Sequence, residues 1–278
     1  MKDIPYQQYK FKDFTIEGFS RAAVQTFWRI PEFHLGFDLG AQPWMFMGTP
    51  NWFISHTHLD HLAMLPSFVA RRRMMKMDPP RIFLPRANVD NVARLLKAWM
   101  YLDRGQFPCE LIGMEPGEEV TLSREWSVLA LPTQHRVPSL GYVVFHRRNK
   151  LLPELLSLDG NAIRQRKEAG LPITYEIRTP KVAYLGDSNP DGLDQNPLFY
   201  QAEVLIMEMT FVESRHRGDK IHKYGHIHLD DVVAREHLFQ NELIIASHFT
   251  ARSVAGQIHR CVEKAFPTLM DGRLKLWL

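Results

Sequence analysis

The chain has 278 residues, of which 45% are hydrophobic and 23% charged, and its formal net charge is +3. This composition is typical of one folded α/β domain and excludes a disordered chain. The two cysteines are too few for a disulfide framework or a thiolate metal site, which indicates a reducing compartment and buried thiols. No apolar run reaches the roughly 18 residues of a membrane span, and the N-terminus lacks the core of a signal peptide, so we expect a cytoplasmic protein with no membrane partner.

Short segments rich in β-branched and aromatic residues alternate with helical patterns along the chain. The predicted strands are 14–19, 24–30, 34–39, 52–55, 126–131, 141–145, 182–185, 204–207 and 243–246. Helices are predicted over 62–69, 88–102, 155–169 and 230–239. Because neither a linker nor a glycine-rich phosphate loop is visible, we expect a single α/β domain over residues 1–278 in which two sheets lie between outer helices.

The most informative motif is His56-Thr57-His58-Leu59-Asp60-His61, which follows the apolar run Trp52-Phe53-Ile54. Its three imidazoles and one carboxylate can bind metal only if the backbone turns there, and the change from strand to helix supplies such a turn. The alternative is a polar loop of solvated histidines. Because the cysteines lie outside this motif, the metal ligands are expected to be nitrogen and oxygen atoms.

Three later strands also end at a residue that can bind metal: His135, Asp187 and His248. Singly, a histidine after a strand is usually a hydrogen-bonded boundary residue, and an aspartate after glycine usually belongs to a turn. Together with the hexapeptide, they predict a metal site at one edge of the sheets.

The order H-x-H-x-D-H, His, Asp, His resembles the metallo-β-lactamase superfamily, an αββα sandwich that binds two metal ions, and the resemblance covers about residues 34–249. It implies that His56, His58 and His135 bind one ion, that Asp60, His61 and His248 bind the other, and that Asp187 bridges both. We also predict that Asp60 is a catalytic residue. Zinc is the expected metal, although Mn²⁺ or Fe²⁺ accept the same ligands. Two such ions activate water for hydrolysis, so no serine or cysteine nucleophile is required.

Within the superfamily the chain is similar to ribonuclease Z, the endonuclease that removes the 3′ trailer of precursor tRNA. The segments Met207-Glu208-Met209-Thr210-Phe211 and His248-Phe249-Thr250-Ala251-Arg252 match its His-Glu-Ala-Thr-Phe and His-Phe-Ser-x-Arg motifs, and His226 matches a histidine between them. The resemblance implies that His226 protonates the departing 3′ oxygen as general acid and that Glu208 orients its ring. A carboxylate in an apolar stretch also needs a partner, and His226 is the best available. Alternatively, His226 and His228 belong to a helix cap, for which Asp230 and Asp231 would be suitable neighbours.

The chain departs from the family at Met207, which replaces the histidine of the first motif, and at Ser253, where the family often has an aromatic residue after the arginine. A larger departure lies at 146–181. Longer ribonucleases Z carry there a flexible arm with a tip rich in glycine and proline that clamps the tRNA elbow, and no such tip is present here. We therefore expect a shortened insertion, typical of the compact short form or of a relative that has lost the arm and changed substrate. The family also implies a homodimer.

Basic residues at 71–76, and Arg215, Arg217, Lys220 and Lys223, could neutralise RNA phosphates or could be solvated surface groups. Three functions therefore remain open. The first is a ribonuclease Z-like phosphodiesterase that leaves a 3′-hydroxyl and a 5′-phosphate. The second is a hydrolase of a small molecule such as a cyclic phosphodiester or a lactone, and the third is a non-catalytic RNA-binding protein.

Overall fold

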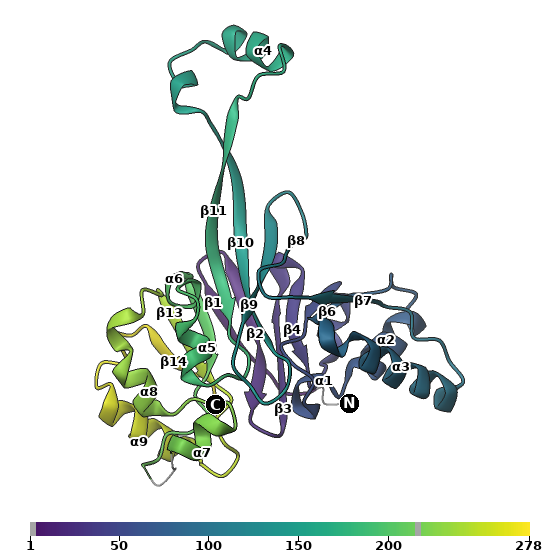
Figure 1. The fold of residues 1–278 in the computed structure, drawn as a ribbon, viewed down its shortest axis with the longest axis vertical. Coiled ribbons are helices and arrows are strands. Elements are labelled where there is room, and N and C mark those ends of the chain that lie inside the picture. The colour runs from purple at the N-terminus through teal and green to yellow at the C-terminus, as the bar shows by residue number, and fades with distance from the viewer. Residues whose placement is uncertain (1–3, 215–217) are drawn as a thin grey trace.

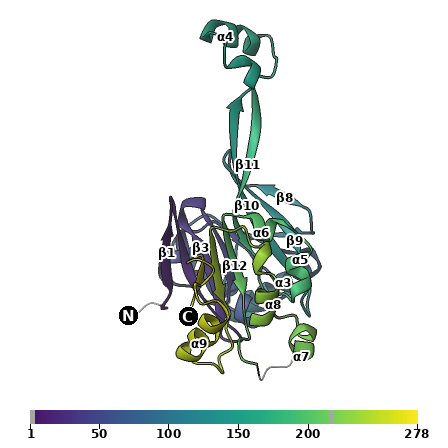
Figure 2. The ribbon, with the colours of Figure 1, turned by 90° about the vertical axis from the view of Figure 1, so that its left-hand side faces the viewer.

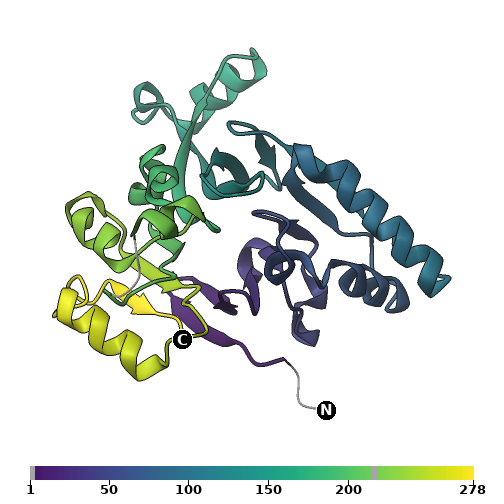
Figure 3. The same cartoon turned by 60° about the horizontal axis from the view of Figure 1, so that its bottom comes forward.

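Two seven-stranded sheets face one another in the computed structural model, which describes residues 4–214 and 218–278 (Figures 1 and 3). Helices cover the outer face of each sheet, so the predicted αββα sandwich is confirmed. None of the helices in this described part combines the length and apolar composition that crossing a bilayer requires.

The first sheet comes from the N-terminal part of the chain. Its strands, in spatial order, are β1 (Gln7–Phe11), β2 (Phe14–Arg21), β3 (Gln25–Ile30), β4 (Leu35–Leu39), β5 (Asn51–Phe53), β6 (Arg81–Pro85) and β7 (Glu110–Met114). The strands pair antiparallel from β1 to β4 and parallel from β4 to β7. Helices α1 (Leu59–Leu62), α2 (Leu65–Met74) and α3 (Val89–Asp103) pack on this sheet.

The second sheet repeats this plan in the C-terminal part. Its strands are β8 (Glu119–Thr121), β9 (Trp126–Pro132), β10 (Leu140–Leu151), β11 (Thr174–Tyr184), β12 (Val204–Glu208), β13 (Leu243–Ser247) and β14 (Leu274–Leu276). They pair antiparallel from β8 to β11 and parallel from β11 to β14. The associated helices are α5 (Pro190–Asp194), α6 (Leu198–Gln201), α7 (Gly218–Lys223), α8 (Leu229–Ala234) and α9 (Ala255–Ala265).

Large aromatic side chains from both sheets fill the space between them. Trp28 and Phe37 of the first sheet meet Tyr142, Tyr184 and Trp277 from the C-terminal half of the chain, and all five are buried. The ring centres of Phe37 and Tyr184 are 4.8 Å apart and the rings are stacked. Such burial, at about 25 cal/mol per Å² of apolar surface, holds the two halves of the sandwich together.

Every predicted strand overlaps a strand of the structure, and β4, β5, β12 and β13 are buried at every position, which explains their mostly apolar sequences. The predicted helix 230–239 is shorter, because α8 ends at Ala234 and a 3₁₀ turn follows at Glu236–Leu238. Strands β1, β6, β7, β8 and β14 and helices α5, α6, α7 and α9 are absent from the prediction. The strand β6 has only three apolar residues between prolines, which is too short for a periodic signal.

The segment 146–181, which we expect to be a shortened insertion, forms an arm of two paired strands, and its length relative to the longer family members stays a prediction. Strands β10 and β11 pair from Tyr142↔Tyr184 to Leu151↔Thr174 and project beyond the sheet (Figures 1 and 2). The predicted helix 155–169 is present at the tip in a shorter form, as α4 (Gly160–Glu168). The parts of β10 and β11 beyond the sheet carry polar side chains on both faces, and Arg147 forms an ion pair with Glu176. They therefore lack the alternation of apolar and polar residues that predicts a half-buried strand.

Candidate metal centre

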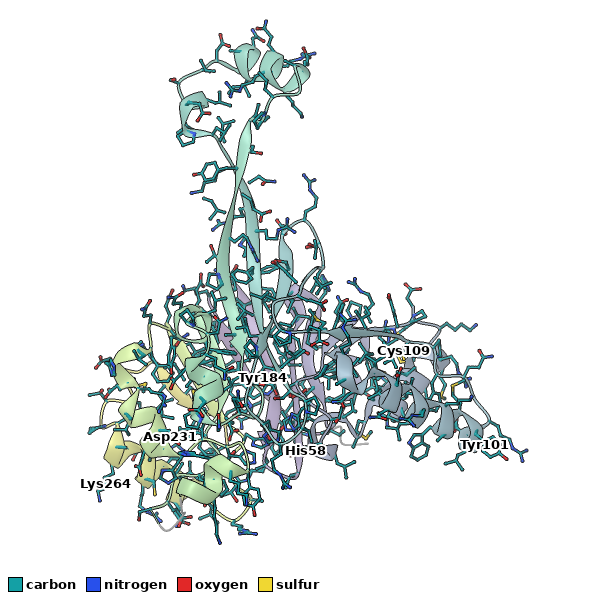
Figure 4. All side chains as sticks on the ribbon, in the orientation of Figure 1. His58, Tyr101, Cys109, Tyr184, Asp231 and Lys264 are labelled. Atoms are coloured by element: carbon teal, nitrogen blue, oxygen red, sulfur yellow. The ribbon has the colours of Figure 1, made fainter. Side chains whose placement is uncertain are left out.

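Loops at one edge of the sandwich carry all the predicted ligands. The hexapeptide follows β5, and His135, Asp187 and His248 follow β9, β11 and β13. Because parallel strands of one sheet end at the same edge, their following loops meet there. Figure 4 shows His58 at this edge, at the opposite end of the molecule from the arm.

The first cluster consists of His56, His58, His135 and Asp187, whose ligand atoms all lie within 4.8 Å of one another. The Nδ1 atom of His58 is 3.1 Å from Nε2 of His56 and 3.2 Å from Nε2 of His135. A tetrahedral zinc site with bonds of about 2.0–2.1 Å places two ligand nitrogens about 3.3 Å apart. The spacing of these imidazoles therefore fits a metal ion.

The second cluster consists of Asp60, His61 and His248. The Nε2 atom of His248 is 3.5 Å from Oδ2 of Asp60 and 3.3 Å from Nε2 of His61. Asp187 lies between the clusters, because its Oδ1 is 3.4 Å from Nε2 of both His61 and His248, whereas its Oδ2 is 3.8 Å from Nε2 of His56. One carboxylate thus presents a different oxygen to each cluster, which is the arrangement that a bridging ligand needs.

Hydrogen bonds on the outer side of the rings direct the lone pairs inward. The hydroxyl of Ser55 donates to Asp38 and therefore accepts from Nδ1 of His56 at 3.0 Å, while Nδ1 of His135 donates to the carbonyl of Gly225 at 2.9 Å. Burial is the largest cause that lowers the pKa of both His56 and His135. Neutral rings with their Nε2 lone pairs facing the buried carboxylate of Asp187 form a donor set that fits divalent cations.

Asp38 is a positioning residue that the sequence analysis missed. Its fully buried carboxylate accepts from the amide and hydroxyl of Ser55 at 2.7 and 2.8 Å, from Nδ1 of His61 at 2.7 Å, and from the hydroxyl of Tyr184. A carboxylate behind a ligand histidine fixes its tautomer and orientation. A single aspartate within the apolar stretch Leu35–Leu39 was the available signal, because a buried charge requires partners.

The turn between β2 and β3 supports Asp60. The amide of Ala23 donates to Oδ2 of Asp60 at 2.8 Å. Burial raises the pKa of Asp60, but its hydrogen bond to His248 and the charge of His61 outweigh burial and lower the pKa to about 2. A β-carbon at Gly40 would lie 1.7 Å from the carbonyl oxygen of Asp60, so only glycine permits this close approach.

A hydrogen-bonded pair, Glu208 and His226, lies beside the clusters. Nδ1 of His226 is 3.1 Å from both carboxylate oxygens of Glu208. Burial lowers the pKa of His226, but the charge of Glu208 and its hydrogen bond outweigh burial and raise the pKa to about 9. The hydroxyl of Thr210 donates to Glu208 and contacts Nδ1 of His248 at 3.0 Å, so the pair is also linked to the second cluster.

The helix-cap alternative describes His228 and not His226. His228 is the N-cap of α8, where its Nδ1 accepts from the amide of Asp230 at 3.1 Å and Asp231 completes a capping box. The ring of His226 is instead bound to Glu208. The two histidines therefore have different roles, as their different partners show.

The other candidate groups contribute less to the site. Arg72 is buried and donates to the carbonyls of Met47, Thr49 and Asp78, so it stabilises a loop and is not free to bind phosphate. Arg215 and Arg217 lie outside the described residues. Both cysteines are free and only partly buried, and burial raises the pKa of Cys109 to about 11, which makes its thiol a poor nucleophile.

A cleft of about 460 Å³ opens onto the clusters. Its lining includes Asp60, Asp187, His226 and His248, together with Tyr224 and Arg252. The cleft joins metal-binding groups, a protonated histidine and solvent. This combination suits metal-assisted hydrolysis of a substrate that binds from outside.

The fold and the ligand clusters are those of the β-lactamase superfamily, and the model of the beta-lactamase superfamily domain matches residues 52–249. A solved neighbour, the metallo-beta-lactamase fold protein YhfI from Bacillus subtilis, superposes with a TM-score of 0.60 at 14% identity, over 95% of this chain and 87% of its own. That likeness concerns the fold.

Two curated relatives narrow the assignment. The chain is 34% identical to tRNase Z TRZ1 of Arabidopsis thaliana over 267 residues, which is 95% of each chain. It is 30% identical to the chloroplastic tRNase Z TRZ2 of the same plant over 257 residues, covering 92% of this chain and 73% of the relative. The chain therefore belongs to the tRNase Z family.

Proposed function

We propose that this protein is an endoribonuclease that holds two divalent metal ions, most favourably Zn²⁺, and removes the 3′ trailer of precursor tRNA. The observation that carries the proposal is the hydrogen-bonded pair Glu208–His226, which Thr210 links to His248 of the second cluster. The pair occurs in a chain of the tRNase Z family. A hydrolase of small esters could use the same ligands and the same acid, so it is the membership of the tRNase Z family that favours RNA as the substrate.

The two clusters would hold one ion each. The first ion would bind to His56, His58 and His135, the second to Asp60, His61 and His248, and the oxygens of Asp187 would bind both. When bound, such ions supply an activated water and neutralise charge on the phosphate. The protein's part is to keep the ligand rings aligned, which Asp38, Ser55 and Gly225 do through their hydrogen bonds.

His226 would protonate the 3′ oxygen as the phosphodiester breaks. Its Nδ1 is occupied by Glu208, so Nε2 is the nitrogen that remains to donate a proton. With a pKa of about 9, the ring carries that proton at neutral pH. The products would be a 3′-hydroxyl on the tRNA and a 5′-phosphate on the trailer.

The arm would bind the body of the tRNA. Strand β10 runs from the metal edge toward the tip, and its twelve residues span roughly 36 Å, about one turn of a nucleic acid double helix. Lys167 at the tip is exposed, whereas Arg164 pairs with Glu168. A folded RNA whose end enters the cleft could therefore reach the tip, and an isolated small ester could not.

The decisive experiment is incubation of the zinc- or manganese-loaded protein with a precursor tRNA that carries a labelled trailer. We expect one cut that leaves a 3′-hydroxyl on the tRNA, and no cut with Asp187→Asn. Hydrolysis of bis-p-nitrophenyl phosphate with the RNA left intact would contradict the proposal and support a small-molecule hydrolase. RNA binding that weakens with salt, without hydrolysis of either substrate, would support a non-catalytic protein.

We also propose a homodimer that works in the cytoplasm. Helix α3 exposes Trp99, Tyr101 and Leu102 by 46%, 86% and 70%, and exposed apolar side chains of this size favour association. Light scattering should give twice the chain mass. One relative is named chloroplastic, so localisation of a tagged chain in its own cells is the test of compartment.

A further inference from the structure

An exposed aromatic ring lies in the cleft and has no role in the chemistry described above. Tyr224 is 47% exposed and lines the cleft together with Asp187 and His226. The guanidinium carbon of Arg136 lies 5.2 Å from the centre of its ring, and Arg136 is itself exposed. A cation over the ring holds the ring in place while much of its surface still faces the solvent.

The backbone fixes Tyr224 relative to His226. Gly225 has φ +75°, and its amide donates to the carbonyl of His222 at 2.9 Å, while the amide of His226 donates to that of Ile221 at 3.2 Å. These two bonds are the Schellman motif that ends α7. The carbonyl of Gly225 also accepts from His135. The aromatic ring, the general acid and a metal ligand are thus joined through one rigid turn.

The position of His226 decides which nucleotide lies beside Tyr224. A general acid must approach within about 3 Å of the oxygen that it protonates, which here is the 3′ oxygen of the nucleotide on the 5′ side of the cut. That nucleotide is the last one of the tRNA product. The base of that nucleotide therefore lies no farther from His226 than the length of one nucleotide, in the cleft that Tyr224 lines.

Resting on the proposed function, we infer that Tyr224, held by Arg136, is a stacking platform for the nucleobase immediately 5′ to the scissile phosphate. Stacking on an aromatic side chain tolerates any base, because every base has a π face. It also requires an unpaired base, which the single-stranded end of an RNA provides. Tyr224 would accordingly position the substrate and take no part in proton transfer.

The test combines a protein variant with an RNA lesion. Precursor tRNA is prepared intact and with an abasic nucleotide directly 5′ to the cut, and kcat/KM is measured for wild type, Tyr224→Leu and Tyr224→Phe. On intact RNA, Tyr224→Leu is expected to lower kcat/KM about 5- to 150-fold, and Tyr224→Phe to stay within about twofold of wild type. On abasic RNA the wild type is expected to lose the same factor and Tyr224→Leu to lose nothing further.

Matched controls identify the cause of a negative result. Trp44→Leu removes another exposed ring that does not line the cleft and should leave kcat/KM unchanged on both RNAs. An abasic nucleotide 3′ to the cut should leave the effect of Tyr224→Leu intact. Wild type that cleaves intact and abasic RNA equally well would overturn the stacking inference without any variant, as would an equal loss by Tyr224→Leu on both RNAs. Wild type that cleaves neither RNA would instead refute the proposed function.

Discussion

The carboxylate of Glu208 accepts hydrogen bonds from four groups although it is only 2% exposed. The donors are the amides of Ser188 and Ile227 at 2.8 and 3.2 Å, the hydroxyl of Thr210 and the ring of His226. These donors offset the cost of removing the charge from water. The charge in turn keeps the ring of His226 protonated and aimed.

Replacing His226 by alanine is expected to lower kcat on precursor tRNA about 10²- to 10⁴-fold, because a general acid is lost. Metal content, measured by atomic emission, should stay at the wild-type value. The control is His228→Ala, which removes a helix cap and should cost about 1 kcal/mol of folding free energy with little change in kcat. Since Asp187, His226 and His248 also lie close enough to share an ion, loss of metal from His226→Ala would show that His226 is a ligand.

The pH dependence of kcat should have a basic limb near pH 9. The acid acts as imidazolium, so its active form predominates below the pKa of about 9 and is lost as the pH rises through that value. In Glu208→Gln, burial lowers the pKa without the opposing charge, and the limb should move to lower pH. A limb at the same pH in both proteins would show that another group sets it.

Asp38→Asn is expected to weaken metal binding about 10- to 100-fold. Asparagine can turn its amide hydrogens toward His61 and Ser55, which opposes the tautomer that leaves Nε2 of His61 free to bind. Titration with Zn²⁺ against a competing chelator measures this change. Asp103→Asn, at the exposed end of α3, is the matched control. Equal affinity in the two variants would contradict the role of Asp38.

At the scale of elements, the arm shows how strands can form without an apolar face. Its two strands are held by backbone pairing and by the Arg147–Glu176 ion pair at 2.7 Å, while Arg178 of β11 pairs with Glu119 of β8 at 2.6 Å. Exposed pairs of this kind add little stability. Buried Tyr142 pairs with Tyr184 where β10 and β11 enter the sheet, and the register shifts by one residue between Val144 and Phe145, where the arm begins.

Replacing residues 152–173 by a short glycine–serine turn is expected to raise KM for precursor tRNA about tenfold or more. Basic groups lost from the tip would also lower the slope of log affinity against log salt, by about 0.7–0.9 for each phosphate contact. Hydrolysis of bis-p-nitrophenyl phosphate should be unchanged, because the metal edge lies at the other end of β10. An unchanged KM for RNA would mean that the arm does not bind the substrate.

At the scale of the whole molecule, the metal centre joins the two halves of the sandwich. His56 and Asp60 follow strand β5 of the first sheet, whereas His135, Asp187 and His248 follow strands of the second sheet. The turn before β3 also reaches across, since the amide of Ala22 donates to the carbonyl of Phe249. Bound ions would therefore stabilise the contact between the halves.

Removal of metal by a chelator is expected to lower the melting temperature. With free Zn²⁺ at about 100 times its Kd, binding contributes about 2.7 kcal/mol, which corresponds to roughly 5 to 10 °C for a domain of this size. Differential scanning calorimetry of the metal-free and reloaded protein measures the shift. In Asp187→Asn the addition of Zn²⁺ should produce a much smaller shift, and an equal shift would show that zinc binds elsewhere.

The sequence by itself predicted the sandwich, which the structure confirms, and the side chains that gather at the candidate metal centre. Buried strands must be apolar, and the loops that follow them carry side chains with recognisable metal chemistry, so His56, His135 and Asp187 were identified from their order alone. The partnership of Glu208 and His226 followed from the cost of an unpaired buried carboxylate.

Only the tertiary structure decided which atoms meet. The role of Asp38 depends on contacts with Ser55, His61 and Tyr184, which are 17 to 146 positions away in sequence. The strands of the arm could not be predicted from the sequence, because backbone pairing between polar strands leaves no hydrophobic pattern. The inferred role of the exposed Tyr224 ring depends on the turn that places Tyr224 and His226 in the same cleft. For Asp38 and for the arm, the deciding interaction joins residues that no local pattern relates.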